Sequence, residues 1–430
     1  MTELSIQSDA AQLAGTQGSR SASLAEWRAG FPVVITSFFG LAIAVLSSWS
    51  IGLFIEPIQK ETGWGRGEIS AGLIMVSIVG FCAAPFVGRL IDKIGVRKVG
   101  LVGMVVYCLA FSLLGTSGGQ LWQWWGMWLF LAIGYVLVKP TLWAVAVSQR
   151  FDVHRGLALA VTMSGSGVLL IVMPAIVTAL IADYGWRMSY AILGGGSALL
   201  TLPLMVLFLR DRKPLPVADD ARATEAEDAA DAASAKAELW AALLSKRFIC
   251  LLLVAVLVTI AIIGLQVHFI PLLVEKGADR ATAAMITGMI GVGSITGRLT
   301  CGFLMDRTRG QRVAALFFAL PAISSIFLLS YDGNVVVGCA IAFTQGLALG
   351  AEIDVMTFLV SRYFGLRNYG TLVGTVVGFL IVGNGVGPTI AGWVFDVTGS
   401  YQLFVIAVIP IFLLCSLLIG TLGDYPRHAR

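Results

Sequence analysis

The chain has 430 residues, of which 57% are hydrophobic and only 13% are charged, and its mean hydropathy is +0.88. Soluble domains carry about 25% charged residues, so this composition excludes an ordinary soluble protein and predicts a chain that crosses a membrane many times. The formal net charge of +4 is small, and no stretch gathers basic residues as a nucleic-acid surface does. The six cysteines lie in apolar segments without a CxxC pair, a pattern that indicates neither disulfides nor a metal site.

In chain order, a polar N-terminal segment without the apolar core of a cleaved signal peptide precedes twelve apolar stretches long enough to span a bilayer. A charged, alanine-rich segment with no apolar face separates the sixth stretch from the seventh and predicts a linker. The predicted units are an N-terminal tail (1–28), a six-helix bundle (29–210), a cytoplasmic linker (211–246), a second six-helix bundle (247–423) and a C-terminal tail (424–430).

Orientation follows from the positions of the 29 Lys and Arg residues. Most of them fall in the tails, the linker and the loops on the same side, whereas the opposite loops hold few. The positive-inside rule therefore predicts a multi-pass protein of the inner (cell) membrane with both termini in the cytoplasm. At the end of the linker, Glu238–Arg247 has the pattern of a short amphipathic helix that lies on the membrane surface.

An internal repeat relates the two predicted bundles. Gly134–Arg150 and Leu347–Tyr363 are similar stretches; the first places Lys139 inside an apolar helix and the second places Glu352 at the matching position, 213 residues later, with Asp354 close by. At about 1.5 Å per residue, both positions lie roughly 15 Å inside the membrane, near the middle of a hydrocarbon core of about 30 Å. Charges at that depth are costly and normally face a wet cavity, so the repeat predicts a central binding site between the halves.

Several motifs resemble those of a known family. Gly88–Lys98 (GRLIDKIGVRK) and its counterpart Gly302–Arg312 (GFLMDRTRGQR) resemble the loop motif of the major facilitator superfamily. Ile58–Ser70 (IQKETGWGRGEIS) and Arg150–Gly167 (RFDVHRGLALAVTMSGSG) are similar to its monocarboxylate porter and oxalate/formate antiporter branch. Ser47–Ser50 departs from the animal porters, which carry an acidic residue and a lysine there, so a bacterial member is the better match. The resemblance implies an all-α membrane fold of twelve helices in two six-helix bundles.

The resemblance also implies roles for charged residues. Arg298 takes the position of an arginine that binds the carboxylate substrate, and its guanidinium fork can grip a carboxylate through two parallel hydrogen bonds. The alternative for Arg298 is a structural pair with Glu352 or Asp354, or a side chain that reaches towards the cytoplasm. By the same resemblance, a charge relay at the cytoplasmic rim locks one conformation and consists of Asp92, Arg97, Lys98 and Asp306.

Other candidate site residues follow from their chemistry. Lys139, which precedes a helix-kinking proline, is predicted as a second anion ligand or as a static partner of Glu352 or Asp354. One of these two acids, which cannot share a helix face, is predicted to carry a coupling proton, and the alternative is charge balance. His268 could bind substrate, relay a proton, or simply be packed and hydrogen-bonded. The cavity could further be lined by Tyr135, Trp49, Gln266 and Asn384, although plain helix packing explains any single one of them.

Together these features predict a monomeric secondary active transporter of small organic anions: mono- or dicarboxylates, or aromatic acids. Proton-coupled symport by alternating access is the favoured mechanism, with the carboxylate, protons and the lipid bilayer as partners. Carboxylate/carboxylate antiport is the first alternative, and efflux of drugs or metabolites is a weaker one, because Arg298 and Lys139 are cationic. No HExxH pattern occurs and no paired Cys/His cluster is present, so we expect no enzyme activity, cofactor or metal.

Overall fold

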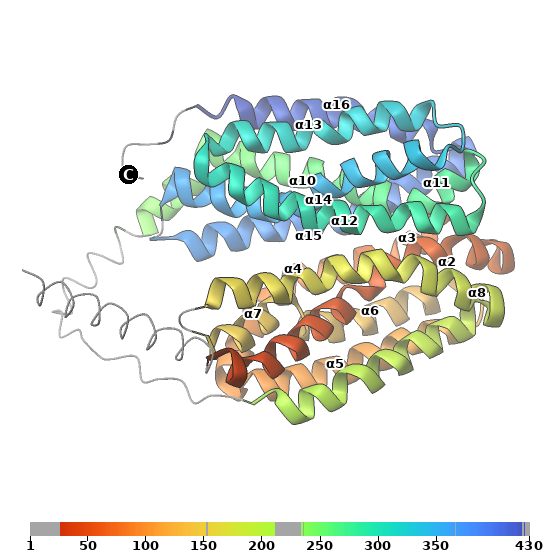
Figure 1. Ribbon diagram of the computed structural model, residues 1–430, viewed down its shortest axis with the longest axis horizontal. Coiled ribbons are helices and arrows are strands. Elements are labelled where there is room, and N and C mark those ends of the chain that lie inside the picture. The colour runs from red at the N-terminus through yellow and green to blue at the C-terminus, as the bar shows by residue number, and fades with distance from the viewer. Residues whose placement is uncertain are drawn as a thin grey trace, which may run out of the picture.

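The computed structural model describes residues 26–151, 154–210, 234, 236–365, 367–423 and 425, without the side chains of residues 84, 85 and 92. This described part is helical with short connections, as the composition predicts (Figure 1). Most of the predicted tails and of the predicted linker lies outside the described residues. The predicted surface helix is present over residues 236–243, and the following helix begins at Lys246.

The N-terminal half begins with a span over Glu26–Thr62 that turns at Val45. Just after this turn, the backbone amide of Ser47 donates a hydrogen bond to the hydroxyl of Tyr107 at 2.9 Å. The elements of this half are α2 (Leu46–Thr62), α3 (Arg66–Ser70), α4 (Gly72–Ile94), α5 (Val96–Leu113), η1 (Leu114–Thr116), α6 (Leu121–Leu137), α7 (Pro140–Ser148) and α8 (Arg155–Phe208).

The C-terminal half repeats the arrangement after the linker. Its seventh span is divided at His268 into α10 (Lys246–Val267) and α11 (Phe269–Glu275), because Pro271 has no N–H for the carbonyl of Val267. The remaining helices are α12 (Arg280–Arg307), α13 (Gly310–Leu329), α14 (Val335–Phe364), α15 (Tyr369–Thr398) and α16 (Gln402–Gly420).

The number of spans agrees with the sequence. Ten described helices are long and apolar enough to cross a membrane. One of them, α8, bends at Gly185, where φ is 73°, and therefore supplies two spans. Another membrane-length helix, α12, is not among the ten. The described residues thus contain twelve membrane-length segments, and the predicted all-α fold is confirmed.

Local sequence explains where the helices end. Gly63 closes α2 with φ of 75°, a left-handed conformation that glycine adopts without steric cost. Asn334 begins α14, because its side-chain oxygen accepts the amides of Val336 and Val337. Asp279 begins α12 in the same way through the amide of Thr282.

The two halves lie side by side and meet mainly where α8 packs on α12 and where α3 and α4 pack on α15, with smaller contacts of α2 to α10 and α11 (Figure 1). Contact in the first pair is close enough that a Cβ atom on Gly291 would lie 2.7 Å from the carbonyl oxygen of Gly167. Small residues permit this backbone approach between membrane helices. The halves therefore approach one another closely along α8 and α12.

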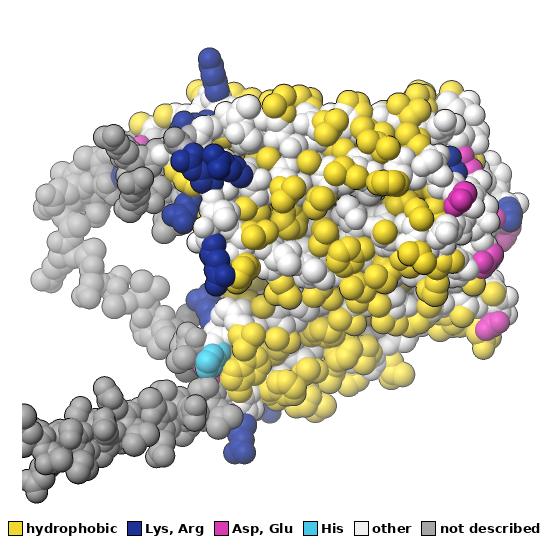
Figure 2. Space-filling model, turned by 45° about the horizontal axis from the view of Figure 1, so that its top comes forward, with side chains coloured by type: hydrophobic (Ala, Val, Ile, Leu, Met, Phe, Trp, Pro, Cys, Tyr) yellow, Lys and Arg dark blue, Asp and Glu magenta, His cyan; other side chains and the backbone are white. Residues whose placement is uncertain are grey.

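Charge divides the molecule lengthwise, because apolar side chains cover its flanks and charged ones its two ends (Figure 2). One end carries mainly Lys and Arg and the other mainly Asp and Glu. We call the first the basic end, which includes Lys93, Lys98, Arg307 and Arg312. We call the second the acidic end, which includes Glu61, Glu275, Asp332 and Asp396 at the opposite ends of the helices.

Candidate functional site

Lys139 lies at a break in the fourth span, as its position before Pro140 predicts. Pro140 has no N–H, so α6 ends at Leu137 and α7 begins at the proline. The indole of Trp143 donates to the carbonyl of Val138 at 2.8 Å and so satisfies one group that the break sets free. Trp143 is thereby buried as part of the break. The repeat counterpart of this segment, around Glu352, lies in the unbroken helix α14.

The ammonium of Lys139 lies where the two halves meet. Lys139 is only 9% exposed, and its Nζ donates to the carbonyl of Gly80 on α4 at 2.8 Å. A Cβ atom on Gly80 would lie 3.2 Å from Nζ and 3.4 Å from Ile381 of α15. The ring of Tyr135 is centred 5.9 Å from Nζ. Among the described side chains, no carboxylate pairs with this lysine, so neither static partner expected from the sequence is present.

Arg298, by contrast, has an acidic neighbour. Its Nε lies 3.3 Å from Oδ2 of Asp354, between the closely packed helices α12 and α14, and each side chain is about a third exposed (34% and 35%). The contact is an ion pair without an aligned hydrogen bond, since Nε remains without an acceptor. Within the described part of the chain, the fork of Arg298 makes no hydrogen bond. Its two terminal nitrogens therefore stay free for an anion.

Glu352 points away from both cations, towards α10. It is 6% exposed, and its carboxyl forms a short hydrogen bond with the hydroxyl of Thr259. The same hydroxyl lies 2.7 Å from the carbonyl of Ala255, which can only accept. One hydroxyl proton cannot serve both oxygens, so a proton on Glu352 would satisfy all three groups. Asp354, two residues later, faces Arg298 instead, as the spacing predicts.

His268 is enclosed at the junction of α10 and α11 and is 1% exposed. Its Nε2 lies 2.8 Å from the carbonyl oxygen of Pro388, so this nitrogen carries the proton. Its Nδ1 then accepts from the hydroxyl of Tyr401 at 2.8 Å. Both ring nitrogens are satisfied by the neutral imidazole. In this conformation His268 is a packed, hydrogen-bonded residue, which is the structural alternative considered from the sequence.

The structure separates the other predicted site residues. Trp49 and Tyr135 are half-buried, Gln266 is buried, and Asn384 is exposed. Lys98 and Asp306 are exposed at the basic end, whereas Arg97 donates to the carbonyl of Val206 at 2.8 Å and ties α5 to α8. The side chain of Asp92, the fourth residue of the predicted relay, lies outside the described residues.

The acidic end contains a cross-half seal that sequence reasoning did not assign. Asp396 of α15 accepts the backbone amides of Arg66 and Gly67, both at 2.8 Å. The guanidinium of Arg66 lies 3.6 Å from the ring centre of Phe395 and donates to Tyr401, which in turn bonds His268. Two signals were available: Arg66 lies in the motif after the first span, and Asp396 is the repeat counterpart of Asp183.

A second part of the seal lies on α12. Arg280 donates to the carbonyl of Leu53 at 2.7 Å and pairs with Glu56 at 3.3 Å, both on α2. The described polar contacts between the halves thus gather at the acidic end. A central site around Lys139 is therefore closed towards the acidic end in this conformation.

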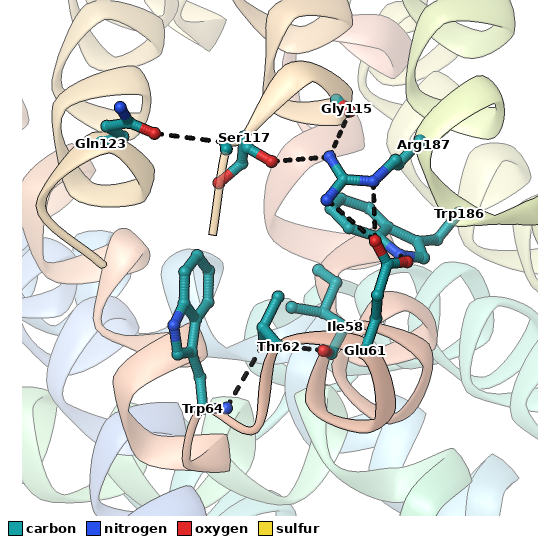
Figure 3. A network of polar contacts seen from close by, with 10 residues as sticks. Ile58, Glu61, Thr62, Trp64, Gly115, Ser117, Gln123, Trp186 and Arg187 are labelled. Atoms are coloured by element: carbon teal, nitrogen blue, oxygen red, sulfur yellow. Dashed lines mark hydrogen bonds and ion pairs between the residues drawn. The ribbon is translucent and has the colours of Figure 1, made fainter. Parts of the chain in front are cut away.

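A network within the N-terminal half braces the same end (Figure 3). Arg187 donates to the carbonyls of Gly115 and Ser117 and pairs with Glu61, which also accepts the indole of Trp186 at 2.6 Å. These contacts join α2, the α5–α6 connection and the bend of α8. The seal can therefore open by movement of a whole half while this brace stays intact.

Comparisons with known proteins agree with this arrangement. The family model described as Major Facilitator Superfamily matches residues 37–350 and 269–430. Monocarboxylate transporter 12 of Mus musculus is 25% identical over 66% of this chain and 63% of its own length, so the match spans less than two thirds of that relative. Monocarboxylate transporter 10 of Homo sapiens is 26% identical over 83% of this chain and 68% of its own length. The uncharacterized MFS-type transporter YcxA of Bacillus subtilis (strain 168) is 25% identical over 89% of this chain and 92% of its own length.

Solved structures show the same fold at low identity. A D-xylose–proton symporter covers 92% of this chain and 98% of its own at 14% identity, with a TM-score of 0.69. A point mutant of the nucleoside transporter NupG covers 92% of this chain and 100% of its own at 12% identity, with a TM-score of 0.73. At these identities the likeness concerns the fold alone.

Proposed function

Because the chain belongs to the major facilitator superfamily, a family of transporters, we propose that it carries small carboxylates across the membrane by alternating access. The names of the curated relatives support the substrate class, and the buried Lys139 with the partly exposed Arg298 supports it independently. Chemical catalysis is not part of this function, since the family and its relatives are transporters.

The observation that carries the proposal is the lone ammonium of Lys139. It is buried at the contact of the two halves, and a backbone carbonyl is its only hydrogen-bond partner among the described residues. An unneutralised cation in a low-dielectric site attracts an anion strongly. A substrate carboxylate between Lys139 and the free fork of Arg298 would complete the charge balance. Both halves would then grip the same substrate, which alternating access about a central site requires.

Proton coupling rests on the two acids of α14. In this proposal Glu352, which is hydrogen-bonded to Thr259, holds the proton, and Asp354 releases Arg298 when the substrate arrives. We favour symport of the carboxylate with a proton. The alternative is exchange of one carboxylate for another, in which Lys139 and Arg298 would bind each carboxylate in turn and no proton site would be needed. The basic end is assigned to the cytoplasm, so this conformation would face inward, and the protein is taken as a monomer of the inner membrane.

The test is uptake of radiolabelled carboxylates into proteoliposomes, with and without an inward proton gradient. Lys139→Met should abolish uptake, and Lys246→Met should leave it unchanged, because Lys246 is exposed at the start of α10. Uptake that needs an internal anion and ignores pH would favour exchange. If no carboxylate is carried, or if Lys139→Met transports normally, the proposed function is wrong.

A further inference from the structure

A small cavity in the C-terminal half has no role in the site described above. It has a volume of about 10 Å³ and lies between α10, the start of α11, α12 and α14. Its apolar walls include Ile262, Phe269 and Ile290, and its polar lining consists of Gln266 and Gln345. These helices form two packed pairs, α10 with α15 and α12 with α14, and the cavity lies where the pairs face one another.

Both glutamines that line this space carry a buried amide oxygen without a partner among the described residues. Gln266 is 9% exposed and Gln345 is 5% exposed, yet neither Oε1 has a hydrogen-bond partner among the described residues. The orientation of the Gln345 amide is fixed by its neighbour. The hydroxyl of Ser325 donates to the carbonyl of Pro321 at 2.7 Å, so it can only accept from the NH₂ of Gln345, 3.4 Å away. The oxygen of Gln345 is therefore a buried acceptor without a donor.

Size restricts what can supply that donor. A space of this volume holds about one water molecule or one hydroxyl group, and no larger donor. A buried carbonyl oxygen without a donor is costly, so a hydroxyl of matching size gains a hydrogen bond on entering. The source could be a trapped water or the end of a bound substrate.

The cavity lies beyond the charged site, towards the acidic end. Its wall at Leu349 is one helical turn from Glu352, and its wall at Ile262 is one turn from Thr259. Gln345 is nine residues from Asp354 along α14, which corresponds to roughly 13 Å. A substrate held by its carboxylate at Arg298 would thus need an extended body to reach the glutamines with its far end. The lining beside the glutamines is apolar and includes the ring of Phe269, against which an aromatic body can pack.

We propose that Gln345 and Gln266 form an acceptor subsite for the terminal hydroxyl of an elongated substrate, namely a hydroxylated aromatic carboxylate. This inference rests on the proposed carboxylate transport and narrows its substrate class. The carboxylate lies at Arg298 and Lys139, the ring packs beside Phe269 next to the cavity, and the hydroxyl enters the cavity and donates to the amide oxygen of Gln345. Without substrate, one water molecule occupies the same space.

The experiment compares 4-hydroxyphenylacetate with phenylacetate, which differ only in the hydroxyl. In the wild type, the hydroxylated acid should have a KM about tenfold lower. Gln345→Leu should raise the KM of the hydroxylated acid about tenfold and leave that of phenylacetate unchanged or lower. The matched control is Gln311→Leu, because Gln311 is also buried with an unpartnered amide oxygen but lies at the basic end.

Each other outcome has a distinct meaning. Equal KM values for the two acids in the wild type, or an equal loss of both in Gln345→Leu, would overturn the subsite and leave the cavity to a water. Transport of small carboxylates without either aromatic acid would also overturn it, while the proposed function stands. Absence of all carboxylate transport would instead refute the proposed function. If Gln345→Leu does not reach the membrane, the wild-type comparison and Gln266→Leu decide.

Discussion

Replacing Gly52 with alanine should hold the acidic end of the protein open. In the present conformation α2 and α10 meet through their backbones, and a Cβ atom on Gly52 would lie 1.8 Å from the carbonyl oxygen of Val267. That carbonyl is exposed to α2 because Pro271, four residues later, has no N–H for it. Since the clash is with backbone, no side-chain rotation can relieve it.

The magnitude follows from the neighbouring seal. Restoring an ordinary contact requires α2 to move away by about 1.5 Å. Such a shift would stretch the 2.7 Å bond from Arg280 to the carbonyl of Leu53 beyond hydrogen-bonding distance and would weaken the pair with Glu56. Losing these partly buried contacts costs about 2 kcal/mol. The equilibrium should therefore shift roughly 30-fold towards states open at the acidic end.

The assay is reaction with a membrane-impermeant maleimide at Ser70→Cys, in a variant without the six native cysteines. Ser70 is fully buried under the seal, beside His268, so the parent should react slowly. Gly52→Ala should accelerate the reaction roughly 30-fold and lower the maximal rate of transport. The control is Gly195→Ala, where a Cβ atom would meet nothing within 4 Å. Unchanged labelling and unchanged transport in Gly52→Ala would refute the reasoning.

Three further predictions concern single residues. Glu352→Gln should abolish accumulation driven by a proton gradient but retain exchange of labelled for unlabelled anion, measured by counterflow; intact accumulation would show that the proton is carried elsewhere. Asp396→Asn leaves one carbonyl oxygen for two backbone amides, so labelling at Ser70→Cys should accelerate about tenfold, and an unchanged rate would exclude this carboxylate from the seal. Gly63→Ala forces a side chain into a left-handed conformation and should cost about 1 kcal/mol, seen as a lower midpoint of thermal unfolding with unaltered KM; an unchanged midpoint would contradict this.

Much of the architecture could be predicted from local sequence. Apolar segments of membrane length must satisfy their own backbone hydrogen bonds, so they become helices wherever they occur. The repeat that relates Gly134–Arg150 to Leu347–Tyr363 indicated two halves, and Pro140 predicted the break beside Lys139. These features depend on single segments, and the structure retains them with small changes such as the bend at Gly185.

The partners of the charged residues could not be predicted in this way. From the sequence, Lys139 was predicted either to bind an anion or to pair with an acid of α14, and that helix turns Asp354 towards Arg298 and Glu352 towards Thr259. The helical rotation that decides this is set by packing of α14 against α12, where glycines bring the backbones together. The seal through Arg66 was missed for the same reason, because its acceptor lies 330 residues away.

The sequence by itself therefore determined the membrane environment, the helices, the two related halves and the presence of charges at mid-depth, because each depends on composition or on neighbours within a few turns. Only the tertiary structure decided which cation is left without a carboxylate, which acid rests on a hydroxyl, and which end of the molecule is closed. Those outcomes depend on how whole helices rotate and approach one another, and this is settled by the summed packing of many side chains rather than by any motif.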